Sequence, residues 1–214
     1  MINRICISIN NRCNLGCKYC HFHEKSILDD ADMDVFKILD NVKTYAKGNF
    51  KIGFVGNGEG LLDWPKLKSY IAYLEDYPNI SIYTITNGTV SLNDEEWRFL
   101  ENHSVNVGFS MDGYKELHDK NRGNSFDKAM HNVDEYKRVT GHYPTFNATV
   151  GEDSLLNADK VINFFKPFGV RVTFSRMIGR YGISLQEYRD FLESAEKTLE
   201  VRRGGLDCTM YGGQ

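Results

Sequence analysis

The stretch Cys13-Asn-Leu-Gly-Cys17-Lys-Tyr-Cys20 places three of the five cysteines of this 214-residue chain close together. Three thiolates at this spacing can ligate three corners of an iron–sulfur cube and leave the fourth iron without a protein ligand. An iron with an open position can bind and activate a small molecule, whereas a fully ligated cluster mainly transfers electrons. The alternative is a structural zinc site completed by His21 or His23, because zinc also accepts three cysteines and one histidine.

The composition is that of an ordinary soluble globular protein, with 41% hydrophobic residues, 26% charged residues and a net charge of −3. This charge gives no reason to expect a nucleic-acid or anionic-membrane partner. The alternating start, residues 1–9, lacks the apolar run of a signal peptide, and no stretch is apolar enough to span a membrane. Clustered cysteines without a secretion signal indicate metal ligands rather than disulfides. We therefore expect a cytoplasmic protein.

Strand-like and helix-like patterns alternate along the chain. The predicted strands are 5–10, 51–55, 80–86, 105–110, 145–150 and 170–178. The predicted helices are 33–46, one beginning at Pro65, 93–100, one capped by Ser125, 160–168, and one capped by Ser184 that reaches 203. Strands joined by helices are parallel, with right-handed crossovers. Six such units predict an α/β fold, a partial (β/α)6 TIM-like barrel over residues 1–203, followed by a short tail over 204–214.

The residues that could bind a ligand or take part in chemistry follow the predicted strands. β/α barrels form their active sites at these strand ends. The loops are the cysteine loop after the first strand, Gly56-Asn-Gly-Glu59-Gly after the second, Thr86-Asn87-Gly after the third and Ser110-Met-Asp112-Gly after the fourth. Because the carboxyl ends of parallel strands meet at one end of a barrel, we expect these loops to form one site.

The cysteine spacing just after a first strand, with these loops in register, resembles the signature of the radical S-adenosylmethionine (SAM) enzymes. The resemblance covers nearly the whole chain. It implies a 4Fe-4S cluster on Cys13, Cys17 and Cys20, with SAM as the second cofactor. Members of the family cleave SAM to a 5′-deoxyadenosyl radical, which abstracts a substrate hydrogen. An electron donor such as flavodoxin or ferredoxin is then an expected partner.

The stretch that begins Ser110-Met-Asp-Gly and continues through His118-Asp, Arg122-Gly and Ser125-Phe resembles one branch of this family, the anaerobic sulfatase maturases and SPASM-type peptide maturases. By this resemblance, Ser110 donates its hydroxyl to SAM, and the guanidinium of Arg122 binds the SAM carboxylate through two parallel bonds. The alternative for Arg122 is a surface ion pair with Asp119 or Asp127.

Two neighbours of that stretch are interpreted as structural. Asp112 is expected to be a turn residue, and His118 is expected to support the fold. No catalytic acid or base is assigned.

The family usually has Gly-Gly-Glu-Pro after the second strand, where this chain has Asn57-Gly58-Glu59-Gly60. Gly58 would let the backbone approach SAM, and Glu59 would accept hydrogen bonds from the SAM ammonium. Tyr19 matches the aromatic position near the adenine. Weaker SAM-binding candidates are Thr86, Asn87, Asn147 and Met177. Alternation along 145–150 predicts that Asn147 and Thr149 face the barrel interior.

The branch resemblance implies a peptide or protein side chain as substrate. The alternatives are a radical SAM enzyme for a small molecule, such as a nucleotide or sugar, and a non-enzymatic zinc or iron–sulfur protein. In the peptide-maturase branch, a cysteine shortly after the barrel opens an auxiliary-cluster extension. Cys208 stands at that point, but only Cys6 and Cys208 remain outside the motif. We therefore expect either a lost extension or a fragment of a longer protein.

Overall fold

A computed structural model describes residues 3–20, 34–45 and 48–204. One parallel sheet in the order β1-β2-β3-β4-β5-β6-β7 forms its centre, and each strand pairs with the next along the chain. The strands are β1 (Arg4–Cys6), β2 (Phe50–Phe54), β3 (Ile80–Thr86), β4 (Asn106–Ser110), β5 (Thr145–Val150), β6 (Val172–Arg176) and β7 (Val201–Gly204). The expected parallel α/β partial barrel is confirmed, with a seventh strand.

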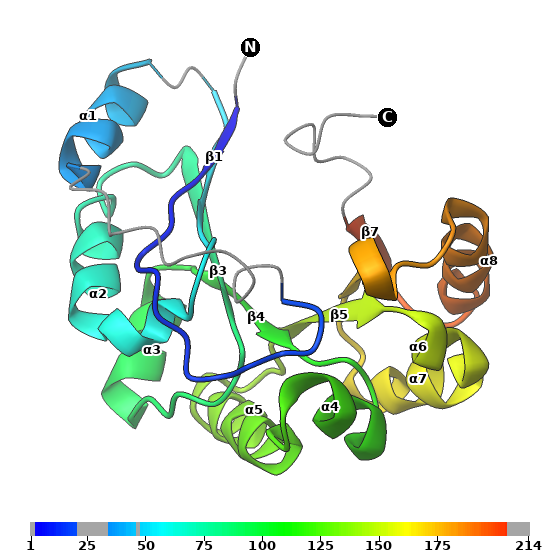
Figure 1. The fold of residues 1–214 in the computed structure, drawn as a ribbon. Coiled ribbons are helices and arrows are strands. Elements are labelled where there is room, and N and C mark those ends of the chain that lie inside the picture. Colours follow the sequence, from blue (N-terminus) through cyan, green and yellow to red (C-terminus); the bar gives the residue numbers. More distant parts are fainter. Residues whose placement is uncertain (1–2, 21–33, 46–47, 205–214) are drawn as a thin grey trace.

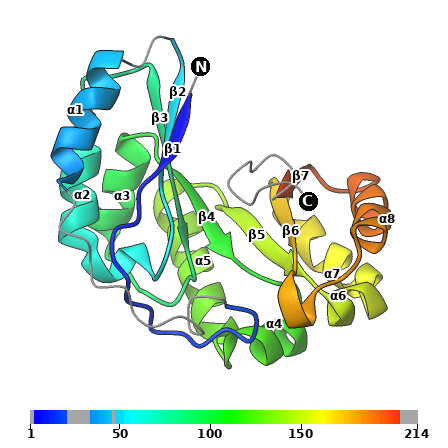
Figure 2. The ribbon, with the colours of Figure 1, turned by 45° about the horizontal axis from the view of Figure 1, so that its top comes forward.

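The helices lie on the outer side of this sheet, which curls into a half-barrel with β1 and β7 as its two edges (Figure 1, Figure 2). They are α1 (Val35–Tyr45), α2 (Trp64–Ala72), α3 (Asp94–Asn102), α4 (Lys115–Arg122), α5 (Phe126–Thr140), α6 (Glu152–Leu156), α7 (Ala158–Phe165) and α8 (Leu185–Glu196). Short 3₁₀ helices are η1 (Gly60–Asp63), η2 (Lys166–Phe168) and η3 (Gly179–Tyr181). No helix among the described residues is long and apolar enough to cross a membrane.

Alternating side chains divide the sheet into two faces. In β5, Phe146, Ala148 and Val150 are buried against the helices. Asn147 and Thr149 lie on the opposite face, as their alternation predicted. The same alternation in β3 buries Ile80 and Ile82. The apolar core therefore lies between the sheet and the outer helices, and the inner face of the sheet is left to polar residues.

Capping residues begin two helices as expected and one differently. Asn93 and Ser184 each accept a hydrogen bond from the third helical residue in a complete capping box, which starts α3 and α8. Ser125 precedes α5, but its hydroxyl makes no cap bond. That hydroxyl instead donates to the carbonyl of Arg122, 3.0 Å away. The predicted cap at Ser125 is thus wrong in its hydrogen bond, although the helix begins where expected.

The C-terminal elements differ most from the prediction. The expected helix to residue 203 ends at Glu196, and Val201 pairs with Val172 to add β7 to the sheet. The helix predicted over 160–168 stops at Phe165 and continues as η2, because Pro167 has no N–H to donate.

The N-terminal elements differ less. The first strand is shorter than 5–10 and ends at Cys6. Beyond it, the Ser8 hydroxyl donates to the carbonyls of Asn10 and Asn57. The ends of the helix predicted over 33–46 lie outside the described residues, which give α1 as Val35–Tyr45.

The capping box of α3 gives a test of local stability. Replacing Asn93 with alanine removes the acceptor for the Glu96 amide and is expected to lower the free energy of unfolding by about 1 kcal/mol. Urea unfolding followed by circular dichroism measures this change. Asn93→Asp keeps an acceptor oxygen and should stay within a few tenths of a kcal/mol of the wild type. Equal losses in both variants would contradict the role given to the cap.

Candidate active site

Loops at the carboxyl ends of the first four strands, together with α4, surround a cavity of about 310 Å³. This volume is within the range of small-molecule sites. Among the lining residues are Cys13, Cys17, Tyr19, Cys20, Gly58, Glu59, Asn87, Ser110 and Arg122. The folded chain thus brings the cysteine motif and most of the predicted SAM-binding residues around one space.

The cysteine loop is held against α4 and the loop after β3. The Lys18 amide donates to the Asn121 carbonyl at 2.8 Å, and the Cys20 amide donates to the Cys17 carbonyl at 3.0 Å. The Asn87 side-chain amide lies 3.8 Å from the Cys13 sulfur. Burial raises the pKa of the Cys17 thiol, while the positive charge of Arg122 opposes that rise. The loop therefore has defined neighbours on two sides.

A cluster and a single metal ion make different demands on the three thiols. Within the described ranges, no three His, Cys, Asp or Glu side chains are gathered closely enough to hold one metal ion. In an iron–sulfur cube each thiolate ligates a different iron, so the sulfurs need not converge on one point. A structural zinc requires four ligands around one centre. His21 and His23, the expected zinc ligands, lie outside the described residues.

The glycine loop after β2 packs directly on the start of the cysteine loop. Gly58 has a φ of +74°, and a Cβ there would lie 2.4 Å from the Arg12 carbonyl oxygen, so only glycine fits. The Glu59 amide donates to the same Arg12 carbonyl at 2.7 Å. The Asn10 side chain donates to the Glu59 carbonyl at 3.0 Å. The backbone of Glu59 is therefore fixed by the segment that leads to Cys13.

Glu59 is only 2% exposed, and its carboxylate is held by backbone amides. One oxygen accepts from the Leu61 amide at 3.0 Å, and the other accepts from the Asn87 amide at 2.6 Å. Burial raises the pKa of Glu59, and the bonds from Asn87, Leu61 and the Thr86 hydroxyl oppose that rise. Since each carboxylate oxygen can accept more than one bond, Glu59 retains acceptor capacity. Thr86 thus supports Glu59 and does not line the cavity.

Asp112 is the residue that sequence reasoning most underestimated. Its side chain has no exposed surface. Four donors reach its carboxylate: the Tyr19 hydroxyl at 2.8 Å and, each at 3.1 Å, the Asn121 side chain, the Arg122 guanidinium and the Thr149 amide. The interpretation of Asp112 as a turn residue is therefore wrong, because its side chain joins the cysteine loop, α4 and β5.

Arg122 is buried, so the alternative of a surface ion pair with Asp119 or Asp127 is also wrong. Burial opposes its charge, but the nearby Asp112 carboxylate raises the pKa of Arg122 and keeps the guanidinium protonated. The Nε atom has no hydrogen-bond partner among the described residues. A buried, charged donor that lines the cavity and is not satisfied by protein suits an anionic group such as a carboxylate.

His118 has the structural role expected of it. It is fully buried, its Nδ1 lies 3.4 Å from the Asp112 amide, and its Nε2 lies 3.0 Å from the Ser125 hydroxyl. Burial lowers the pKa of His118 to about 4. The neutral ring therefore links the Asp112 backbone to Ser125, the residue before α5.

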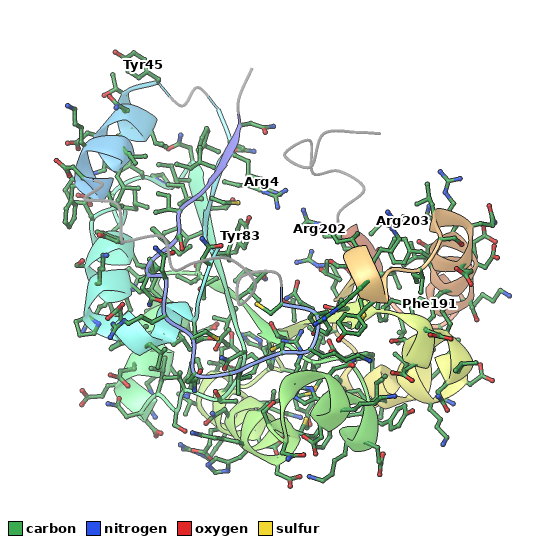
Figure 3. All side chains as sticks on the ribbon, in the orientation of Figure 1. Arg4, Tyr45, Tyr83, Phe191, Arg202 and Arg203 are labelled. Carbon is green, nitrogen blue, oxygen red and sulfur yellow. The ribbon has the colours of Figure 1, made fainter. Side chains whose placement is uncertain are left out.

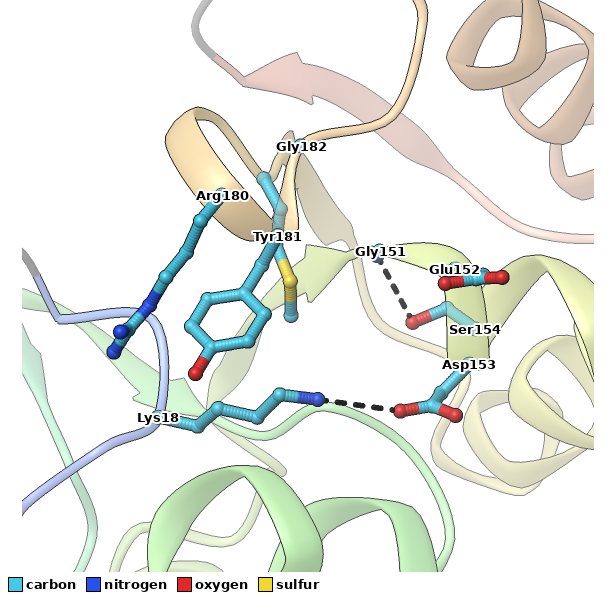
Figure 4. A pocket seen from close by; sticks show the side chains of 9 residues that line it. Lys18, Gly151, Glu152, Asp153, Ser154, Arg180, Tyr181 and Gly182 are labelled. Atoms are coloured by element: carbon cyan, nitrogen blue, oxygen red, sulfur yellow. Dashed lines mark hydrogen bonds and ion pairs between the residues drawn. The ribbon is translucent and has the colours of Figure 1, made fainter.

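A second cavity of about 90 Å³ lies between the cysteine loop and the loops after β5 and β6 (Figure 4). The Lys18 ammonium reaches Asp153 at 3.4 Å and lies 4.8 Å from the centre of the Tyr181 ring. Met177 lines this second cavity rather than the first. Asn147 lies outside both cavities, on the inner face of β5 in register with Ser110.

A curled parallel half-barrel with a three-cysteine loop at the carboxyl end of its first strand has the architecture of the radical SAM enzymes. The sequence profile of the Radical SAM superfamily matches residues 7–152, and the chain belongs to this superfamily. It is a family of enzymes whose cofactors are a 4Fe-4S cluster and SAM.

Curated relatives include anaerobic sulfatase-maturating enzymes. The chain is 29% identical to the cysteine-type enzyme of Clostridium novyi, over 73% of this chain and 46% of that protein. It is 31% identical to the cysteine-type enzyme of Clostridium perfringens (strain ATCC 13124), over 94% of this chain and 64% of that protein. The chain therefore spans roughly half to two thirds of these relatives.

Solved structures share the fold. Native anSMEcpe with bound AdoMet and Cp18Cys peptide superposes with a TM-score of 0.73 at 24% identity, covering 91% of this chain and 58% of that one. Streptococcus suis SuiB bound to the precursor peptide SuiA superposes with a TM-score of 0.77 at 15% identity, covering 96% of this chain and 49% of that one. At these identities the likeness establishes the half-barrel fold alone.

The Asp112–Arg122 pair gives a test of the site's construction. Asp112→Asn and Arg122→Gln each leave one buried group without its charged partner, so each should lower the free energy of unfolding by about 3 kcal/mol. The double variant should lose clearly less than the sum, because the second change removes the orphaned charge. Urea unfolding measures all three. Lys120→Gln, which removes a largely exposed ion pair with Asp153, is the control and should cost under about 1 kcal/mol. Additive losses at Asp112 and Arg122 would argue against their coupling.

The buried ring of His118 gives a pH test. Its folded pKa of about 4 is below the ordinary 6.5, so the folded ring stays neutral and stability falls as the pH drops from 6.5 toward 4. NMR of ring carbons between neutral and mildly acidic pH should show His118 unprotonated at pH 5.5. His142 is the comparison: partial burial opposes its charge, but the Tyr143 carbonyl and Glu101 raise its pKa. Protonation of His118 near pH 6.5 would contradict this environment.

Proposed function

We propose that this protein cleaves SAM reductively and abstracts a hydrogen atom from a side chain of a peptide or protein. The observation that carries the proposal is the single cavity lined by Cys13, Cys17, Cys20, Glu59 and Arg122. When bound there, the cluster and SAM would supply the 5′-deoxyadenosyl radical that begins the reaction.

The charges around the cavity match the amino-acid end of SAM. Glu59 has no cationic partner among the described residues and can accept from an ammonium group. Arg122 keeps its charge and has an unpaired Nε for a carboxylate. Ser110 adds a hydroxyl at the end of β4. A carboxylate and a guanidinium at separate points of one cavity would bind and orient a zwitterion, which supports the assignment of all three as SAM-binding residues.

The remaining candidates are assigned supporting positions. Tyr19 and Asn87 line the same cavity and would contact SAM directly. Thr86 would act through Glu59, whose carboxylate it supports. Asn147 would contact SAM from the inner face of β5, and Met177 would contact the adenine from the second cavity.

The relatives favour a peptide substrate. The curated relatives are named sulfatase-maturating enzymes, and two similar structures contain Cp18Cys or SuiA peptides. We propose by analogy that this chain also modifies a peptide, with flavodoxin or ferredoxin as the electron donor. A reduced thiolate-bound cluster is suited to a reducing compartment, so we place the enzyme in the cytoplasm.

The test is anaerobic. Protein reconstituted with iron and sulfide should turn brown, bind about four irons per chain, and convert SAM to 5′-deoxyadenosine when dithionite is added. Alanine at Cys13, Cys17 or Cys20 should abolish both the cluster and the product, since each loss removes one iron's protein ligand. Glu59→Gln should keep the cluster and raise the concentration of SAM needed for half-maximal cleavage. Absorbance, iron analysis and mass spectrometry give the readouts.

Cys6→Ser is the matched control, because Cys6 lies on β1 outside the motif. It should retain the iron content and the product of the wild type. A colourless protein that binds zinc would overturn the proposal in favour of the metalloprotein alternative. A fully loaded cluster that forms no 5′-deoxyadenosine would overturn the catalytic part alone.

A further inference from the structure

The inner face of the half-barrel has an unusual distribution of charge. Register places on this face Arg4, Cys6, Lys51, Gly53, Ser81, Tyr83, Ile85, Asn106, Gly108, Ser110, Thr145, Asn147, Thr149, Thr173, Ser175 and Arg202. None of these strand positions is Asp or Glu, although acidic residues outnumber basic ones in the chain, 29 to 26. The face is therefore cationic within a protein of negative net charge.

Two of the cations are direct neighbours. Arg4 of β1 and Lys51 of β2 are register partners, so their side chains leave the sheet side by side, and both are exposed. Like charges on adjacent strands destabilise a sheet. No carboxylate of the described residues forms an ion pair with either of them. An anion between them would remove this repulsion.

The Arg4 guanidinium is also oriented. Its Nε donates to the Tyr83 hydroxyl at 3.2 Å, and the guanidinium lies 5.5 Å from the centre of the Tyr83 ring. Tyr83 can reach across β2 only because residue 53 is glycine, where a Cβ would lie 2.3 Å from the ring. Cys6, which lies 3.3 Å from the same hydroxyl, is another neighbour of Arg4, and the guanidinium has no carboxylate partner among the described residues. Gly53 thus sets the position in which Arg4 is held.

The opposite edge of the sheet presents a third cation. Arg202 of β7 is the register partner of Thr173, so it lies on the inner face, and it is exposed. Figure 3 shows Arg4, Tyr83 and Arg202 on the two sides of the opening between β1 and β7. Arg203, the next residue, lies on the outer face and is paired with Glu196 at 2.8 Å. Arg202 and Arg203 therefore lie on the same strand but on opposite faces of the sheet.

We infer that Arg4, Lys51 and Arg202 bind an acidic segment of the peptide substrate along the inner face. That this segment belongs to the substrate rests on the proposed function. The ligand that fits is a peptide with Asp or Glu side chains, because the cations stand at separate points of an extended polar surface rather than around one small pocket. Carboxylates accept the paired bonds that arginine offers.

The position of the cations sets the spacing. Lys51 lies a few residues before the glycine loop, which begins at residue 56. At a rise of about 3.3 Å per strand residue, the two points are separated by a distance on the order of 15 Å. An extended peptide crosses that length in about five residues. The acidic side chain is therefore separated by several residues from the one that is modified at the carboxyl end of the barrel.

Binding of a fluorescent hexaglutamate peptide to the reconstituted full chain with SAM tests the inference. Fluorescence anisotropy should show that hexaglutamate binds at least tenfold more tightly than hexaglutamine at about 0.15 M ionic strength. Arg4→Gln, Lys51→Gln and Arg202→Gln should each raise the dissociation constant several-fold. Arg203→Gln also removes one positive charge from β7, but on the outer face of the sheet. It should change the dissociation constant less than twofold.

Each result decides the matter. Equal binding of hexaglutamate and hexaglutamine, or an equal loss in Arg203→Gln and Arg202→Gln, would overturn the inference. Inorganic phosphate that binds with the expected variant pattern while hexaglutamate does not would assign the face to a small anion and overturn it as well. The proposed function is tested separately, by measuring 5′-deoxyadenosine formation from SAM without peptide. If that product is absent but hexaglutamate binds as expected, the cationic face stands and its link to a substrate falls.

Discussion

The carboxylate of Asp112, with its four donors and no exposed surface, is the interaction on which the site depends. A buried charge is costly unless it is paired and hydrogen-bonded, so its partners must all be present when the chain folds. These partners come from the cysteine loop, α4 and β5. Tyr19 of the cysteine loop is thereby linked to Asp112, 93 residues later, and through it to α4 and β5.

The second buried carboxylate, Glu59, is held differently, and the difference gives the cavity its character. Asp112 is compensated by Arg122, whereas Glu59 is held only by amides and a hydroxyl. One wall therefore holds a neutralised acid whose arginine retains an unpaired donor, and another wall holds an acid with no counter-charge. A preorganised site of this kind can align a zwitterion without first rearranging its own charges.

The sequence was informative wherever function or periodicity is local. The cysteine spacing, the glycine loop with Glu59, and the strands at 80–86 and 145–150 follow from short patterns, and the structure places them as expected. Asp112 was misjudged because its four partners lie in three separate segments, and no local pattern identifies them. The second cavity and the Tyr83–Arg4 contact depend on register between strands, which one sequence does not display. The last strand was read as helix because Val201 pairs only with a distant valine.

The order of the strands in the sheet is the order in which the ribosome makes them. Each new strand can add to an edge that already exists, and every pairing closes a loop of similar, moderate length. The half-barrel can therefore grow from its N-terminal end during synthesis. Its cysteine loop is translated first, yet it lacks its contacts with Asn121 and Asp112 until α4 has been made. The three thiols of this loop thus reach their final setting only after α4, more than half of the way along the sequence, has been made.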